Sequence, residues 1–281
     1  MDIFNILIII GLFHFSITVD NDWRDYPTCK IGRLQSPIKI KEYESIYANN
    51  FSFVYQSYKQ CDHCKIIENY AYTINCSEEG GGYINFERGG VIKQYEFIRA
   101  ELYHGLHEVD REKGKYELHL IHRKNLDFVT NKNQYRSIQD PNMYLVVVLR
   151  YLEDCSKGEK ACISDNGLLE QLLSKKSPED VVFDLSKFNI FQEKRAYFYE
   201  GSFVHIPCDE NVNYYIVKDF FYLKKDLIKD DIKIGNIKDV VANLFGRPVY
   251  KNFMNYREVL GNDYFSFKKI VISFLFIIIL L

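Results

Sequence analysis

Residues 97–122 read FIRAELYHGLHEVDREKGKYELHLIH, and this stretch decides the fold. Its two ends alternate large apolar or aromatic residues with polar ones, and a charged, glycine-containing segment (REKGK, 111–115) separates them. That pattern predicts two strands joined by a connection that contains a turn. Residues two apart in a strand share a face, so Glu101 and Tyr103 share one in the first strand, and Glu117 and His119 share one in the second.

The rest of the chain repeats this pattern. Of 281 residues, 22 are Tyr and 21 are Phe, and both types favour strands. Short alternating runs occupy 51–57, 70–76, 81–86, 93–103, 115–122 and 143–153, and glycine-rich turns separate several of them. Helical spacing is confined to 166–175, with four leucines on one side, and more weakly to 231–245. We found no internal repeat or long linker, so the sequence predicts one mainly β (α+β) domain with a few short helices.

The overall charge excludes little. The formal net charge is -2 and the sequence pI is about 6.4, so no global attraction to nucleic acid or to an anionic membrane is expected. We therefore expect no nucleic-acid partner.

The ends of the chain predict processing in the secretory pathway. Residues 3–17 form a short apolar run, and the small residues Ser16 and Thr18 precede Val19, so residues 1–18 are expected to be a cleaved signal peptide rather than a retained anchor. The last twelve residues, 270–281, are apolar but too few to span a bilayer. With Gly261 as attachment site, residues 262–281 match a GPI-attachment signal; a short hydrophobic tail anchor and a buried strand are the alternatives. The folded domain is then 19–261.

Seven cysteines in a secreted chain should mostly be paired. Cys61 and Cys64 have the spacing of half a zinc knuckle or of a redox motif, but no second such pair exists, so a disulfide role is favoured. One pair is expected among these two and Cys76, and which thiol is left over stays open. Cys155 and Cys162 flank a polar turn that a disulfide could close. Asn50 and Asn75 begin N-x-S sequons and are candidate glycosylation sites.

Several separated motifs carry a family resemblance. They are QSPI at 35–38, Gly89-Gly90 followed by Tyr95, ELHLIH at 117–122, YEGSF at 199–203 with Pro207 and Cys208 beyond it, and NLFGRPV at 243–249 followed by Arg257. From about Trp23 to Val259 the chain resembles the α-class carbonic anhydrases. The resemblance implies a single domain with a large, twisted, mostly antiparallel central sheet and short peripheral helices. It also implies a disulfide between Cys29 and Cys208.

In this family three histidines on neighbouring strands hold zinc, whose bound water attacks carbon dioxide. By resemblance His119 fills one ligand position, whereas Glu101 and Tyr103 fill the other two. Shifting the strand by one residue would bring His104 forward, but with Leu102 as its partner. We therefore expect no metal cofactor, and we expect Glu101 and His119 to form a charge-assisted pair in its place. The alternative is a zinc site of Glu101, Tyr103 and His119.

Other family positions are changed as well. Leu106 replaces the carboxylate that orients a threonine hydroxyl, Val204 replaces that threonine, and His205 replaces the next one and is expected to face the cavity. The segment at 69–72 (NYAY) lacks the histidine that would carry the proton away. In contrast, His107, Glu117 and Tyr199 keep the residue types that surround and orient the metal ligands, and His122 is expected to be a satisfied core histidine.

These substitutions predict a cell-surface carbonic-anhydrase-like protein that lacks catalytic zinc and hydratase activity and acts in binding or adhesion. The expected partner is an extracellular protein or glycan, bound at the cavity rim by Tyr70, Tyr72, Tyr103 and His205, and the C-terminal anchor adds the membrane. The alternative is an active zinc carbonic anhydrase with atypical ligands. An esterase is a third reading, although no Ser/His/Asp arrangement can be traced.

Overall fold

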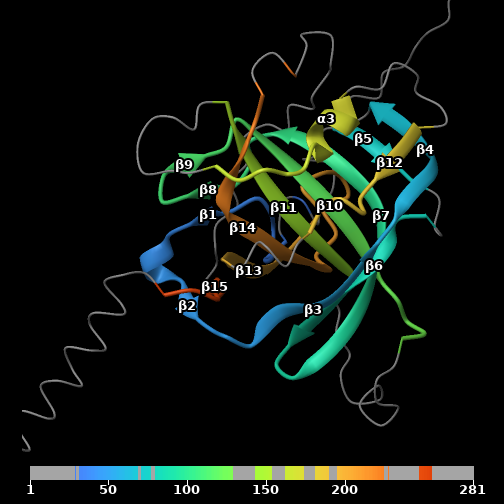
Figure 1. Cartoon of the computed structure of the whole chain (residues 1–281). Coiled ribbons are helices and arrows are strands. Elements are labelled where there is room, and N and C mark those ends of the chain that lie inside the picture. Colours follow the sequence, from blue (N-terminus) through green and yellow to red (C-terminus); the bar gives the residue numbers. More distant parts are fainter. Residues whose placement is uncertain are drawn as a thin grey trace, which may run out of the picture.

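The computed structural model describes residues 29, 32–68, 71–76, 80–128, 143–153, 162–173, 181–189, 195–224, 227 and 247–254. These residues build a twelve-stranded twisted sheet (Figure 1). In chain order its strands are β2 (Ile46–Tyr47), β3 (Phe51–Tyr58), β4 (Gln60–Glu68), β5 (Tyr72–Asn75), β6 (Gly82–Arg88), β7 (Val91–His104), β10 (Tyr116–Lys124), β11 (Tyr144–Leu152), β12 (Val181–Asp184), β13 (Ala196–Gly201), β14 (Val212–Tyr222) and β15 (Tyr250–Lys251).

The order across the sheet is β12-β4-β5-β7-β10-β11-β14-β13-β15-β2, with β6 paired to β7 and β3 paired to β6. The β11–β14 and β15–β2 pairs are parallel, and the other pairs described in this sheet are antiparallel. The strands β7, β10 and β11 therefore lie next to one another in the middle (Figure 1). The predicted fold class, mainly β with a large, mostly antiparallel sheet, is confirmed.

Apolar side chains cover both faces of the sheet, in two clusters that we call the first core and the second core. Leu118 and Leu120 of β10 belong to the first core, whereas Ile121 belongs to the second. Alternation along β10 therefore directs Glu117 and His119 to the face of the second core. Both are buried there, with exposed fractions of 0% and 1%.

The α-helix whose bounds lie among the described residues is α3 (Leu168–Leu173). Asp165, three residues before its start, accepts a hydrogen bond from the backbone N–H of Leu169 at 2.8 Å, which satisfies one of the free N–H groups of the first helical turn. Leu168, Leu169 and Leu172 are buried against the first core, as the leucine spacing predicts. A short 3₁₀ helix, η2 (Glu42–Glu44), lies near the other end of the sheet. The weaker helix expected at 231–245 lies outside the described residues.

A second, three-stranded sheet combines β1 (Lys39–Ile40), β8 (Glu108–Val109) and β9 (Glu112–Lys113). The connection from β8 to β9 turns through Asp110 and Arg111, whose φ angles are 48° and 69°, the combination that tight hairpin turns require. Within the described ranges, no helix has both the length and the apolar character needed to cross a membrane. The segments 1–18 and 262–281, together with Gly261, lie outside these ranges.

Candidate active site

The pairing of β7 with β10 brings the predicted ligand positions together. Glu101 lies opposite His119, and Tyr103 lies opposite Glu117, all on the face of the second core. The alternative register is not adopted, because His104 pairs with Tyr116 and its side chain is exposed. Strand geometry therefore brings together one imidazole, one carboxylate and one phenol, at the positions that the resemblance assigns to the metal ligands.

A buried network surrounds His119. Its Nε2 lies 3.2 Å from Glu117 Oε2, and the same oxygen lies 2.8 Å from His107 Nδ1. Glu117 Oε1 accepts the backbone N–H groups of Leu106 and His107, and His107 Nε2 lies 2.7 Å from the Tyr199 hydroxyl. Each member that resemblance assigns to the metal surroundings is therefore present and connected.

The Glu117 carboxylate carries the negative charge of this network. Burial alone would raise its pKa, but the adjoining His107 and His119 outweigh that effect and hold the pKa well below its usual range. Burial lowers the pKa of His107 despite the Glu117 carboxylate, so its imidazole stays neutral and donates from Nδ1. A neutral imidazole hydrogen-bonded to a carboxylate is the arrangement that orients metal-ligating histidines.

Glu101 has a different set of partners. Its Oε1 accepts a hydrogen bond from Arg99 Nε at 2.6 Å and lies 3.6 Å from His205 Nε2, while its Oε2 accepts the Tyr103 hydroxyl at 2.6 Å. Burial alone would raise the pKa of this carboxyl, but His205 and Arg99 lower it to about 2. Glu101 is therefore a buried, fully ionised carboxylate.

The expected pair of Glu101 with His119 is wrong. Both residues lie in the described part of the chain and face each other across the strands, yet no ion pair joins them. Arg99 lies two residues before Glu101 on the same face and is always charged. Its guanidinium hydrogen-bonds the Glu101 carboxylate, whereas the His119 imidazole contacts Glu117 instead. Sequence reasoning missed Arg99, although its spacing of two from Glu101 was a signal.

His205 reaches this carboxylate from the loop that follows β13. Its Nδ1 donates to the carbonyl of Ile206 at 3.0 Å, which leaves Nε2 directed at Glu101, and Phe203 stacks on its ring at 5.3 Å. Burial alone would lower the pKa of His205, but Glu101 raises it above the ordinary value. That the His205 side chain faces a cavity stays a prediction.

The two positions that should orient a zinc-bound hydroxide are apolar in fact. Leu106 and Val204 are buried, with 4% and 6% exposed, in the second core. Neither side chain offers a donor or an acceptor.

The expected aromatic rim is also wrong. Tyr103 is completely buried, and Tyr72 points to the opposite face, where it packs in the first core and donates to the Leu172 carbonyl. Tyr72 directly follows Ala71, which lies in the second core, so strand alternation directs the Tyr72 side chain to the opposite face. Tyr70 lies outside the described residues. The His205 side chain is 17% exposed.

The residues at the ligand positions do not fit zinc. Glu101 is already bound by Arg99, Tyr103 and His205, and burial raises the pKa of Tyr103 so far that the phenol cannot ionise near neutral pH. A second group, His107 with Glu117 and His119, has donor atoms within 4.8 Å of one another. Those atoms already bond one another, so a metal would have to displace the network.

The structure shows which of the described cysteines form disulfides. Cys29 bonds Cys208, as the resemblance implies, and Cys64 bonds Cys76, which leaves Cys61 as a buried free thiol. Cys162 is also disulfide-bonded, and its expected partner Cys155 lies outside the described residues. The sequon residues Asn50 and Asn75 are exposed, and their glycosylation stays a prediction.

Comparison with known proteins places the chain in a family. Residues 18–252 match the model of the eukaryotic-type carbonic anhydrases. The chain belongs to this family. It is 23% identical over 217 residues to alpha carbonic anhydrase 8 of Arabidopsis thaliana, and 25% identical over 192 residues to a carbonic anhydrase of Nostoc sp.. These matches cover 75% and 67% of this chain but only 49% and 64% of those relatives.

Among solved structures the chain is similar to dioscorin, in a crystal structure of its complex with ascorbate. The TM-score is 0.62 at 18% identity, over 83% of this chain and 91% of dioscorin. This likeness shows that the carbonic anhydrase fold is shared.

Proposed function

We propose that this carbonic anhydrase family member does not hydrate carbon dioxide and acts by binding outside the cell. The observation that carries the first part is the set of partners around Glu101. Its carboxylate stands at a ligand position but is held by Arg99, Tyr103 and His205.

Hydration in this family depends on a metal-bound water that loses its proton near neutral pH. Three neutral imidazoles supply that metal site, and here His119 is the single imidazole at the three positions. The guanidinium of Arg99 adds a fixed positive charge beside them, which repels a divalent cation. Val204 has no hydroxyl to orient the attacking oxygen. Metal binding and nucleophile orientation are therefore both weakened.

The test combines metal analysis with kinetics on the purified secreted domain. After dialysis against zinc, mass spectrometry of the metal content is expected to find none retained, and stopped-flow hydration is expected to match buffer. One zinc per chain, lost in the His119→Gln variant, would overturn the proposal.

The alternative, an active zinc enzyme with atypical ligands, has one observation in its favour. Glu117 bonds His119 Nε2 and leaves Nδ1 available, and its own contacts to His107 and to the backbone are intact. The same experiment separates the two functions, because the alternative requires hydration that disappears with His119.

The proposed location rests on the disulfides. Bonds between Cys29 and Cys208 and between Cys64 and Cys76 form in an oxidising compartment, which supports a secreted or surface protein. We propose that Gly261 carries a GPI anchor. Release from cells by a phospholipase specific for that anchor is the expected result, and retention after treatment contradicts it.

For the partner we propose an extracellular protein or glycan. Because Tyr72 and Tyr103 are buried, other exposed apolar side chains must supply the contact: Tyr43 is 73% exposed, Ile46 50% and Tyr47 43%, all on or beside η2 and the edge strand β2. A labelled domain should bind cells or a glycan array, and Tyr43→Ser with Ile46→Ser should weaken that binding. Tyr222→Ser, at a half-exposed tyrosine of β14, is the control. Binding that neither substitution changes would exclude this surface.

A further inference from the structure

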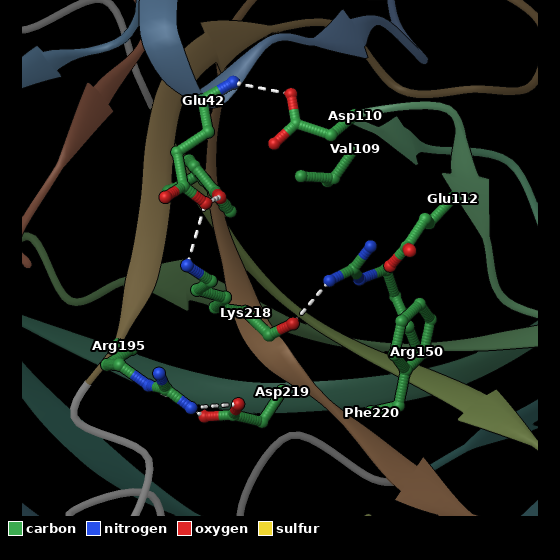
Figure 2. A pocket seen from close by; sticks show the side chains of 10 residues that line it. Glu42, Val109, Asp110, Glu112, Arg150, Arg195, Lys218, Asp219 and Phe220 are labelled. Carbon is green, nitrogen blue, oxygen red and sulfur yellow. Dashed lines mark hydrogen bonds and ion pairs between the residues drawn. The ribbon is translucent and has the colours of Figure 1, made fainter. Parts of the chain in front are cut away.

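A cavity of about 240 Å³ lies away from the Glu101 and His119 positions, between η2, the β8–β9 hairpin and the strands β11, β13 and β14 (Figure 2). A water molecule occupies about 30 Å³, so the cavity has room for on the order of eight heavy atoms. Its lining is rich in charge and consists of Glu42, Val109, Asp110, Glu112, Arg150, Arg195, Tyr197, Lys218, Asp219 and Phe220.

Arg150 supplies the unusual feature of this cavity. The residue is 1% exposed, and its guanidinium projects between Lys218 and Glu112 toward the open centre (Figure 2). Nη2 donates to the carbonyl of Lys218 at 2.5 Å, but Nε and Nη1 have no hydrogen-bond acceptor among the described residues. The ring of Phe220 lies 4.4 Å from the guanidinium carbon and covers one face. Buried charged donors without acceptors are costly, so an acceptor in the cavity would stabilise the protein.

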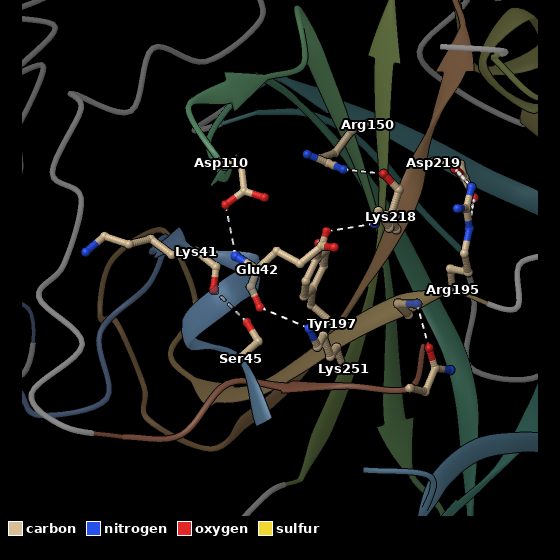
Figure 3. Close-up of polar contacts among 12 residues, drawn as sticks. Lys41, Glu42, Ser45, Asp110, Arg150, Arg195, Tyr197, Lys218, Asp219 and Lys251 are labelled. Carbon is tan, nitrogen blue, oxygen red and sulfur yellow. Dashed lines mark hydrogen bonds and ion pairs between the residues drawn. The ribbon is translucent and has the colours of Figure 1, made fainter. Parts of the chain in front are cut away.

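The other cations of the lining are already bound by carboxylates. Lys218 Nζ lies 2.7 Å from Glu42 Oε2, which also accepts the Tyr197 hydroxyl at 2.6 Å (Figure 3). Arg195 pairs with Asp219 through both of its contacting nitrogens. Among these three basic residues, Arg150 is therefore the one that offers donors to a ligand.

Carboxylates stand at the outer side of the same cavity. Asp110 and Glu112 are exposed residues of the β8–β9 hairpin, and Asp110 is fixed by the Glu42 N–H, which donates to its Oδ1 at 2.9 Å (Figure 3). The lining as a whole has three basic and four acidic side chains, and Glu117 lies across the strand from Arg150. This balance disfavours a doubly charged anion. It favours a ligand that has one carboxylate and one cationic group.

We propose that the cavity binds a small α-amino acid as its zwitterion. The ligand carboxylate accepts a hydrogen bond from one of the two Arg150 donors without an acceptor, Nε or Nη1, which lie on opposite edges of the guanidinium, and the ammonium group lies near the carboxylates of Asp110 and Glu112. The room for about eight heavy atoms matches the smaller amino acids. This binding is independent of the metal positions, and it requires no hydration activity.

Isothermal titration of the purified domain with L-alanine tests the proposal, with acetate and ethylamine as probes that lack one charge each. L-alanine is expected to bind at least tenfold more tightly than either probe. The Arg150→Met variant should lose at least tenfold in affinity, whereas Arg195→Met, which removes a lining arginine already paired with Asp219, should not. Absence of L-alanine binding to the unaltered domain, or equal affinity in Arg150→Met, overturns the proposal.

A second variant covers the case in which Arg150→Met does not fold. Asp110→Asn combined with Glu112→Gln leaves the guanidinium in place and removes the two outer charges. It should weaken L-alanine binding several-fold, whereas acetate, no longer repelled by the two outer charges, should bind no more weakly than before. If acetate or sulfate binds as tightly as L-alanine before this change, the cavity takes simple anions and the amino-acid assignment is wrong.

Discussion

His205 Nε2 lies 3.6 Å from Glu101 Oε1, so a histidine from the loop after β13 reaches a buried carboxylate in the central strand β7. Arg99 and Tyr103 hold the same carboxylate from its own strand. The ion pair with His205 thus ties a loop to the sheet, and the two hydrogen bonds within β7 hold the carboxylate, at a position that the resemblance assigns to a metal ligand. The pair should stabilise the fold in a way that depends on pH.

The His205→Gln variant should show this dependence. Because Glu101 raises the pKa of His205, the histidine contributes fully below its unfolded pKa of about 6.5, and the contribution is lost as pH rises through the folded value. Glu101 titrates at about 2, so it stays charged throughout. We expect His205→Gln to lower the free energy of unfolding by about 1–2 kcal/mol at pH 5.5 and by less above pH 8. Urea unfolding at both pH values measures this, with His104→Gln, at an exposed histidine, as control. A difference independent of pH would contradict the ion pair.

His122 should have the opposite pH dependence. It is completely buried, and its Nε2 lies 2.7 Å from the Tyr58 hydroxyl and its Nδ1 3.2 Å from the Leu145 carbonyl. Burial lowers its pKa to about 4, so the stability it contributes is lost as pH falls from about 6.5 through that value. The advantage of the unaltered protein over His122→Gln should shrink by about 3 kcal/mol between pH 7 and pH 4. An NMR titration that found an imidazole pKa near 6.5 would refute this.

Restoring imidazoles should restore metal binding. Positions 101 and 103 share a face with His119, so a triple variant with Arg99→Gln, Glu101→His and Tyr103→His presents three imidazoles and removes the neighbouring guanidinium. We expect it to retain about one zinc per chain, as a three-histidine site does. Adding His119→Gln should abolish retention. Hydration should stay slow in the triple variant, because Val204 offers no hydroxyl, and a further Val204→Thr change should raise it. Equal zinc content in the unaltered protein would argue against the proposed loss of metal.

The sequence predicted some central strands of the sheet and missed others. The strands β7, β10 and β11 were predicted from long runs rich in aromatic and branched apolar residues. The neighbouring strand β14 was missed, although its first six residues are all buried, as are most residues of β10 and β11. In β4 the buried residues Cys61 and Cys64 are three apart. His63 between them has a φ of 60°, and the register against β12 shifts there, which is the behaviour of a bulge rather than of a regular strand.

In the candidate site, too, some contacts were predictable from the sequence and others were not. The contacts among His107, Glu117 and Tyr199 followed from residue types matched to a family, and they are present. The partners of Glu101 did not follow, because His205 comes from a distant loop and its ring orientation depends on the Ile206 carbonyl and on Phe203. Arg150 was not singled out, since its open donors exist only where η2, the β8–β9 hairpin and β14 meet.

The two described disulfides should differ in their contribution to stability. The Cys29–Cys208 bond spans 179 residues and the Cys64–Cys76 bond spans 12. In the chain-entropy model, closing these loops stabilises the fold by about 5 and about 3 kcal/mol respectively. Replacing both cysteines of the first pair by alanine should therefore lower the free energy of unfolding more than the same change in the second, as denaturant titrations would measure.

The free thiol of Cys61 reports whether the second variant keeps its native packing. Burial raises the pKa of this thiol to about 12, so a thiol reagent should label Cys61 only when the protein unfolds. Rapid labelling of Cys61 in the native Cys64→Ala, Cys76→Ala protein would mean that this bond also holds β4 and β5 closed over the thiol, and a larger loss of stability in this variant than in the first would contradict the ranking.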